Sequence, residues 1–170
     1  MWQYRGQQRP PFAQEPRAGQ ESVWDYPRPP LLQACTGLVV VSVDGEALAR
    51  STRTYRVMET ASPPGFYIPP GDVDLQKLVA APGSSVCEWK GTASYLKLAS
   101  NPEGRAVAWS YPDPIAAFEQ LRGYISFYPG RVDCYVDSEK VRPQPGEFYG
   151  GWITDNVVGP FKGEPDTRHW

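Results

Sequence analysis

The chain has 170 residues, a length that suits one domain or one domain with an arm. Its 19 proline and 16 glycine residues argue against a helical bundle, because proline breaks helix interiors and glycine weakens them. The formal net charge is -2, so the chain lacks the basic surplus that non-specific phosphate binding needs, and we expect no nucleic-acid partner.

The N-terminal stretch MWQYRGQQRPPFAQ has no apolar segment of the kind found in secretory signals. The longest apolar run, at residues 38–41, is far too short to cross a bilayer. We therefore expect a cytoplasmic protein with no membrane partner.

Three cysteines, Cys35, Cys87 and Cys134, stand far apart, and an odd count argues against a disulfide framework. The single histidine is His169, whereas a structural zinc site wants four cysteine or histidine ligands. We therefore expect no bound metal and no cofactor. Each cysteine is predicted to be a small buried residue. Cys87, three residues before Lys90, leaves open a second interpretation as a reactive thiol.

Residues 1–21 are predicted to form a polar, proline-rich arm. We expect an exposed tail over residues 1–20. The alternative is an arm that is anchored from Trp24 onward and packs on the same chain or on a neighbouring one. A homodimer whose arms lie on the partner is the matching expectation for assembly.

Residues 22–170 are predicted to form a single β-rich domain. LVVVSVDGEALARS at residues 38–51 predicts a hairpin that turns at Asp44-Gly45. TYRVMET at residues 54–60 predicts a strand that ends before Pro63-Pro64. Residues 72–79 suit one helical turn, and three apolar side chains of this stretch are expected to point inward: Leu75, Leu78 and Val79.

The second half continues the pattern of short strands. TASYLKLAS and RAVAWSYP predict two strands, YISFYPG a third, and DCYVDSEKV a hairpin that turns at Asp137-Ser138. Between them DPIAAFEQLRG predicts the one convincing helix, with Asp113 as N-cap, Pro114 in the first turn and Gly123 at its end. Many short strands with frequent turns indicate a closed or strongly bent sheet.

Six stretches resemble one known family, the domain of unknown function family numbered 427, which is also filed under a nucleotidyltransferase-like name. They are SVWDYPRPP, RVMETASPPGFYIPPGDV, CEWKGTASY, AWSYPDP, FYPGRVDCYVDSEKV and PQPGEFYGGWITDNVVGPFKGEP. The resemblance covers residues 22 to about 170. It implies a compact bent-sheet or β-tent (Mss4-like) single domain, mainly β with one short helix. It implies no established activity. Many members carry histidine before the Pro-Pro step, where this chain has Ser62.

A nucleotidyltransferase needs clustered carboxylates that hold Mg²⁺. The candidate pairs are Asp72 with Asp74 and Asp133 with Asp137. For both pairs, ordinary turn chemistry is the preferred explanation, most clearly for Asp72 and Asp74, so the sequence predicts no metal ligands.

A different set of residues combines cations, a carboxylate, flat rings and glycines near strand ends. Such a set suits an anionic or planar ligand, by charge and by cation–π contact. The alternative is packing, in which glycines make room for an indole and Glu59 pairs with Arg53, Arg56 or Lys90. The predicted ligand-binding residues are Glu59, Trp89, Lys90, Tyr149, Gly150, Gly151, Trp152 and Lys162.

We therefore expect a domain that binds a small anionic or planar molecule in a pocket where the sheets meet, with chemical transformation of that molecule left open. A metal-dependent nucleotidyltransferase and a protein interaction module without a small ligand are the alternatives. The first predicts an enclosed, charged pocket, the second two carboxylates within reach of one metal ion, and the third a flat aromatic patch.

Overall fold

The Asp-Gly hairpin forms where the sequence predicts it. In the computed structural model, which describes residues 2–170, β3 (Val39–Val43) and β4 (Glu46–Ser51) pair antiparallel. Asp44 and Gly45 have φ of 51° and 80°. Positive φ at both central residues is the geometry that favours Asp-Gly in two-residue hairpins.

The second predicted hairpin extends the same sheet. β11 (Asp133–Val136) and β12 (Glu139–Lys140) pair antiparallel around Asp137 and Ser138, which also have positive φ. β11 lies beside β3, so this four-stranded sheet has the order β12-β11-β3-β4.

A second four-stranded sheet has the order β10-β9-β8-β7. Its edge strand β7 (Leu78–Cys87) is the longest strand of the described chain, and the sequence pattern does not predict it. The Pro82-Gly83 step suggests a turn, but the register shifts there between Ala81 and Ser84, and Gly83 adopts φ of 90°. A bulge on an edge strand accommodates both residues. The other strands are β8 (Gly91–Leu98), β9 (Ala108–Ser110) and β10 (Ile125–Phe127).

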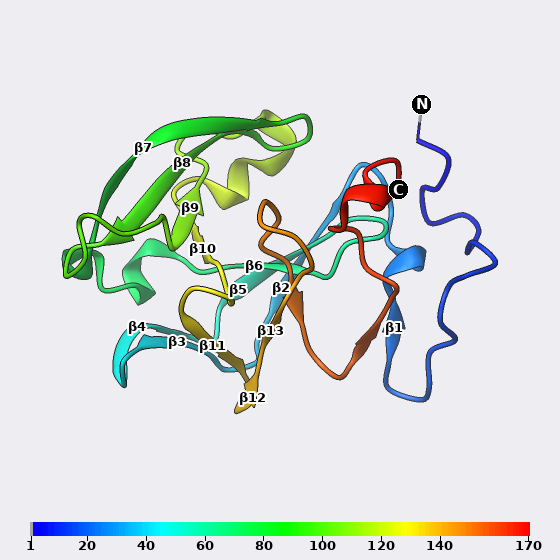
Figure 1. Cartoon of the computed structure of the whole chain (residues 1–170), viewed down its shortest axis with the longest axis horizontal. Helices are drawn as coiled ribbons and strands as arrows, with labels where there is room; N and C mark the ends of the chain where they lie inside the picture. The colour runs from blue at the N-terminus through cyan, green and yellow to red at the C-terminus, as the bar shows by residue number, and fades with distance from the viewer. Residues whose placement is uncertain (1) are drawn as a thin grey trace.

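Three smaller sheets complete the chain (Figure 1). The three-stranded sheet β2-β5-β6 lies between the two larger ones and includes the predicted strand at residues 54–58. The remaining two sheets have two strands each. The strands are β2 (Leu31–Cys35), β5 (Thr54–Met58), β6 (Gly65–Tyr67), β13 (Arg142–Pro143) with β14 (Trp152–Ile153), and β1 (Glu21–Ser22) parallel to β15 (Val157–Val158).

The predicted helix is present but shorter than expected. It is the 3-10 helix η4 (Ala116–Leu121). Ile115, not Asp113, occupies the N-cap, and no side chain caps the helix, so the predicted Asp113 cap is wrong. The other helical segments are single turns: η1 (Val23–Asp25), η2 (Pro70–Asp72), η3 (Leu75–Lys77) and η5 (Pro165–Thr167).

The short turn before β7 buries fewer apolar side chains than predicted. Leu78 is buried, but Leu75 and Val79 are 50% and 38% exposed. The chain passes from η3 directly into an edge strand, which leaves one face of this segment to solvent.

The described chain is thus mainly β, with one short helix and several sheets, as the sequence predicts. No sheet within residues 2–170 closes into a barrel, so of the two expected forms the closed sheet is wrong.

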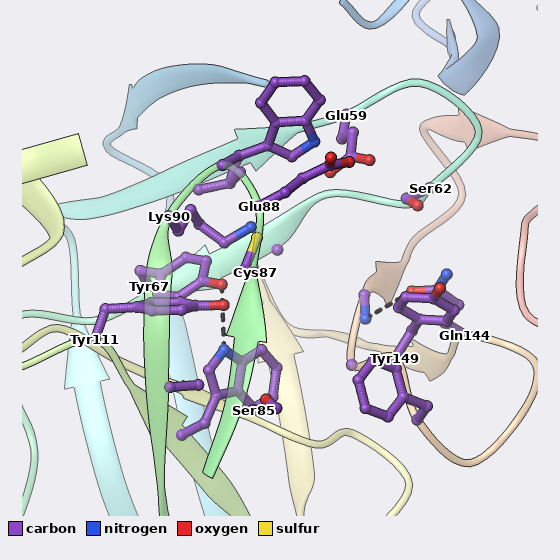
Figure 2. Close-up of a pocket in the computed structure, with 18 of the residues that line it drawn as sticks. Glu59, Ser62, Tyr67, Ser85, Cys87, Glu88, Lys90, Tyr111, Gln144 and Tyr149 are labelled. Atoms are coloured by element: carbon purple, nitrogen blue, oxygen red, sulfur yellow. Dashed lines mark hydrogen bonds between the residues drawn. The ribbon is translucent and has the colours of Figure 1, made fainter. Parts of the chain in front are cut away.

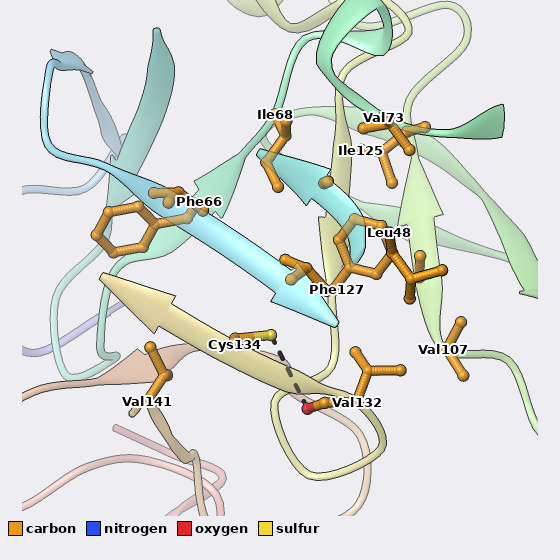
Figure 3. Packing of buried hydrophobic residues seen from close by; sticks show 14 of the residues in the cluster. Leu48, Phe66, Ile68, Val73, Val107, Ile125, Phe127, Val132, Cys134 and Val141 are labelled. Carbon is orange, nitrogen blue, oxygen red and sulfur yellow. Dashed lines mark hydrogen bonds between the residues drawn. The ribbon is translucent and has the colours of Figure 1, made fainter. Parts of the chain in front are cut away.

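The main hydrophobic core lies between the two four-stranded sheets (Figure 3). Val39 and Val41 alternate inward from β3, and Phe127 enters from β10. Trp152 is fully buried, stacks on Phe66 at 4.9 Å between ring centroids, and donates its indole N–H to the Phe127 carbonyl. A second apolar cluster, around Tyr67, Trp109, Tyr111 and Leu121, supports the cavity described below.

The N-terminal segment lies against the rest of the chain instead of projecting as the exposed tail that we expected (Figure 1). Phe12 stacks on Trp170 at 5.1 Å between ring centroids, and Tyr4 packs edge-on against buried Trp24. Arg9 donates twice to the Asp25 carboxylate, with both distances at 2.8 Å. This segment, without strand or helix in residues 2–20, therefore covers part of the surface near η1 and the C-terminal turn.

Candidate functional site

A cavity of about 380 Å³ lies where the three-stranded sheet meets the β7–β8 hairpin and the loop before β14. This volume falls within the range of small-molecule sites, which is roughly 300–1,000 Å³. Seven of the eight predicted ligand-binding residues line it: Glu59, Trp89, Lys90, Tyr149, Gly150, Gly151 and Lys162. Trp152 does not, because it belongs to the main core.

Lys90 is the cation at the inner end of the cavity. It follows β7 in the turn to β8, and its carbonyl accepts a hydrogen bond from Ile115 N at 2.8 Å, which ties the turn to the start of η4. The residue is 8% exposed. Figure 2 shows its nitrogen beside the Cys87 sulfur and facing the hydroxyl groups of Tyr67 and Tyr111. No carboxylate of residues 2–170 lies within ion-pair distance of the Lys90 ammonium.

Burial is the largest influence on the pKa of Lys90 and lowers it, whereas Tyr67, Cys87 and Glu59 together raise it by more, so the pKa ends above its ordinary value. Lys90 is therefore an ammonium throughout the physiological pH range. Its Nζ lies 5.6 Å from the centroid of the Tyr111 ring, so a cation–π contact adds to its stabilisation.

Aromatic side chains form the wall beside Lys90. The Trp109 indole N–H donates to Tyr67 Oη at 3.2 Å, and the rings of Tyr67 and Tyr111 lie 6.2 Å apart. Burial raises the pKa of both tyrosines, so their phenol groups stay uncharged and can donate hydrogen bonds. Ser85 Oγ and Tyr95 Oη, which also line the cavity, share a hydrogen bond of 2.6 Å.

Glu59 lines the cavity but does not pair with any of the three cations that the sequence suggested. It accepts a hydrogen bond from Arg28 Nε at 3.3 Å. Arg53 pairs with Asp72 and Arg56 with Glu21. The Arg28 side chain is fully buried and the Glu59 side chain is 23% exposed. In this ion pair, Arg28 therefore lies in the interior and Glu59 lines the cavity.

Lys162 is the second cation of the cavity and is 6% exposed. Burial, followed by the positive charge of Arg28, lowers its pKa. Its Nζ donates to the Trp170 carbonyl at 3.3 Å and lies 4.7 Å from the ring centroid of Trp2 and 5.5 Å from that of Tyr149.

The adjacent glycines are explained by close contact. A Cβ on Gly150 would overlap the Trp109 ring, and one on Gly151 would come within 2.6 Å of the Pro63 side chain. Gly151 N donates to Gln144 Oε1 at 3.0 Å, and Gln144 Nε2 donates to the Lys162 carbonyl at 2.7 Å. These glycines therefore let the loop close over the aromatic wall, as the packing interpretation predicts.

Trp89 contributes an unusual donor to the cavity lining. Its indole nitrogen is buried and has no hydrogen-bond partner among the described residues. A buried donor without a partner is costly to the folded state.

The two acidic pairs weighed as metal ligands make other contacts. Asp72 accepts from Arg53 and Ser51, Asp133 pairs with Lys140, and Asp137 accepts from Leu38 N. In the described part of the chain, no three histidine, cysteine or acidic side chains gather as a metal site would require.

Several lining residues were not predicted as ligand-binding residues. Tyr67 lies in a stretch that carries the family resemblance, Tyr111 lies near the end of the predicted strand RAVAWSYP, and Gln144 is an ordinary polar residue in a loop. Trp2 lines the cavity from the opposite end of the chain, and no local pattern in the sequence could place it there.

Within residues 2–170, no helix has both the length and the apolar character needed to cross a membrane. The comparison with curated proteins gave no match. A family model does match, over residues 31–138, which is more than half of the chain. That stretch contains β2–β11, and with them Glu59, Tyr67, Lys90 and Tyr111. The chain therefore belongs to the family described as domain of unknown function DUF427, whose model carries the name NTP_transf_9.

Proposed function

We propose that the cavity binds a small ligand in which an anionic group, such as a carboxylate or a phosphate, is attached to a planar or apolar body. The observation that carries this proposal is Lys90, a buried ammonium that faces the cavity without a carboxylate of residues 2–170 in ion-pair distance. A buried charge is costly unless a counter-charge meets it. The anionic group of a ligand would supply that counter-charge.

The surroundings of Lys90 support the same ligand chemistry. The phenol groups of Tyr67 and Tyr111 are hydrogen-bond donors that suit an oxygen anion. The flat faces of the same rings suit the planar or apolar body of the ligand.

Binding can be tested by thermal unfolding with a panel of carboxylates, phosphates, nucleotides and sugars, with and without Mg²⁺. A ligand at 100 times its Kd stabilises the folded state by about 2.7 kcal/mol, which for this chain length raises the unfolding temperature by about 5–10 °C. We expect an anionic member to produce such a shift, and its neutral analogue to produce none.

The decisive variant is Lys90→Met, and its matched control is Lys97→Met on the same hairpin, outside the cavity lining. The shift should persist in Lys97→Met and disappear in Lys90→Met. An equal shift in both variants would contradict a role for Lys90. A shift that requires Mg²⁺ and a nucleoside triphosphate would favour the nucleotidyltransferase alternative, and no shift with any member would favour the interaction module.

A further inference from the structure

Arg28 presents a fixed cationic surface beside the cavity. Its guanidinium donates to three main-chain carbonyls, those of Tyr4, Thr60 and Trp170, at 3.1, 3.1 and 2.9 Å, and it pairs with Glu59. With its edge satisfied in this way and its side chain fully buried, the guanidinium cannot turn, so its flat face keeps one orientation.

Lys162 is fixed beside it by its own main chain. Its N–H donates to the Ala61 carbonyl at 2.8 Å, and its carbonyl accepts from Gln144 at 2.7 Å. Arg28 and Lys162 both donate to the Trp170 main-chain oxygen, at 2.9 and 3.3 Å, which holds the two cationic groups side by side. A guanidinium and an ammonium in this arrangement offer cation–π contacts to the electron-rich face of a π ring.

The ring of Trp2 occupies this position. Its centroid lies 4.1 Å from the Arg28 guanidinium carbon and 4.7 Å from Lys162 Nζ. Trp2 also lines the cavity that contains Lys90. Trp2 and Lys162 therefore line the same cavity as Lys90, and Arg28 contacts the Trp2 ring without itself lining the cavity.

Trp2 is held far less firmly than the surface beneath it. Among the contacts of residues 2–170, its side chain makes one hydrogen bond, from Nε1 to exposed Glu88 at 3.2 Å. The neighbouring segment has anchors of its own, because the Tyr4 carbonyl accepts from Arg28 and the Tyr4 ring packs on Trp24. Trp2 can therefore leave its place while the following residues stay where they are.

We propose that Arg28 and Lys162 form a subsite for the planar ring of the ligand, and that Trp2 is a built-in occupant which the ligand displaces. This inference rests on the proposed function and narrows its ligand class to a flat aromatic ring that carries an anionic group. When an internal side chain competes for the subsite, the apparent affinity equals the intrinsic affinity multiplied by the fraction of time that the subsite is free. Removal of the Trp2 ring should therefore strengthen binding.

Indole acids are suitable probes, because they carry the ring of Trp2 itself together with a carboxylate. Isothermal titration of indole-3-acetate, indole-3-propionate and indole-3-butyrate covers three distances between ring and anion. We expect Trp2→Ala to bind at least one of them roughly tenfold more tightly than the unchanged chain, which corresponds to Trp2 occupying its place about nine-tenths of the time. The neighbouring Gln3→Ala, which lies outside the cavity lining, should leave the affinity unchanged.

Displacement can also be observed directly. In protein that contains 5-fluorotryptophan, the ¹⁹F resonance missing from Trp2→Ala identifies Trp2. Addition of the best probe should move this resonance to the position of a solvent-exposed indole. An unmoved resonance, or weaker binding by Trp2→Ala, would overturn the inference, because Trp2 would then be a fixed wall or a lid over the ligand.

Two further probes separate this inference from the proposed function. Neutral 3-methylindole tests the ring subsite alone, and it should also bind more tightly to Trp2→Ala. Lys90→Met tests the anionic end, and it should lose the preference for the indole acids over 3-methylindole. If Lys90→Met keeps the preference for indole acids while Trp2→Ala binds 3-methylindole more tightly, the proposed function is contradicted and the ring subsite stands. If Lys90→Met loses the preference while Trp2→Ala binds 3-methylindole no more tightly than the unchanged chain, the ring subsite alone is overturned.

Discussion

Arg28 and Glu59 form an ion pair of 3.3 Å whose arginine side chain is fully buried. The pair explains why Lys90 has a different role from the one expected of it. Glu59 already has its partner, so the loss of Lys90 would not leave this carboxylate unpaired. Arg28 therefore has a structural role as the partner of Glu59, whereas Lys90 lines the cavity without such a partner.

The first prediction concerns the stability that Arg28 contributes. Arg28→Met should lower the free energy of unfolding by about 3–5 kcal/mol, because it removes one member of a buried ion pair and leaves carbonyls without donors. Urea denaturation measures this change. The matched control is Arg53→Met, which removes a surface pair with Asp72 at 67% side-chain exposure and should cost about 1 kcal/mol or less. Equal losses in the two variants would contradict the structural role of Arg28.

Lys90 should behave differently. Lys90→Met removes a buried ammonium and leaves a flexible apolar side chain of similar length. The burial cost of the ammonium disappears together with the contacts that raise its pKa, so we expect a correctly folded protein whose free energy of unfolding changes by no more than about 1 kcal/mol, or about 4 °C in unfolding temperature. A large loss of stability in this variant would show that Lys90 supports the fold.

Gly150 should tolerate no side chain. Its φ is not positive, so an alanine would fail for steric reasons, through overlap of the new methyl group with the Trp109 ring. Gly150→Ala should cost about 1–3 kcal/mol, measured by urea denaturation. Gly130→Ala is the control, because its Cβ would meet Pro143 at an ordinary 3.4 Å. A cost at Gly130 as large as that at Gly150 would contradict the steric explanation.

The fold should lose stability in alkali because of its buried tyrosines. Burial raises the pKa of Tyr128 to about 12, and it also raises the pKa of Tyr26, Tyr67 and Tyr111. The unfolded value is about 10, so between these pH values the folded state binds more protons than the unfolded state. The stability from Tyr128 is therefore complete below pH 10 and is lost as the pH rises through about 12.

This loss can be followed by urea denaturation at a series of pH values. Tyr128 alone should contribute about 2–3 kcal/mol of it. Tyr128→Phe keeps the ring that packs on Trp109 at 4.6 Å but removes the ionisable group. The variant should lose correspondingly less stability between pH 10 and 12, and an unchanged alkaline loss would contradict the assignment to Tyr128.

Local chemistry made part of the fold predictable. Asp44-Gly45 and Asp137-Ser138 define their hairpins because two adjacent residues with positive φ are enough to reverse the chain. The element most clearly missed was β7, where Pro82-Gly83 looks like a turn by itself. An antiparallel partner, β8, holds the chain extended on both sides of that step, and no local pattern reports such a partner.

The sequence by itself determined the residue types of the candidate site, since a carboxylate, cations, glycines and rings near strand ends point to seven of the cavity-lining residues. Only the tertiary structure decided how these residues are used. The sequence suggested Arg53, Arg56 and Lys90 as partners of Glu59, yet its partner in the structure is Arg28, 31 positions away. Trp2 donates to Glu88 from 86 positions away. The physical reason is that ion pairs and ring contacts depend on which segments meet in space. Which segments come into contact depends on how the whole chain buries its apolar surface, whereas turn geometry depends on adjacent residues alone.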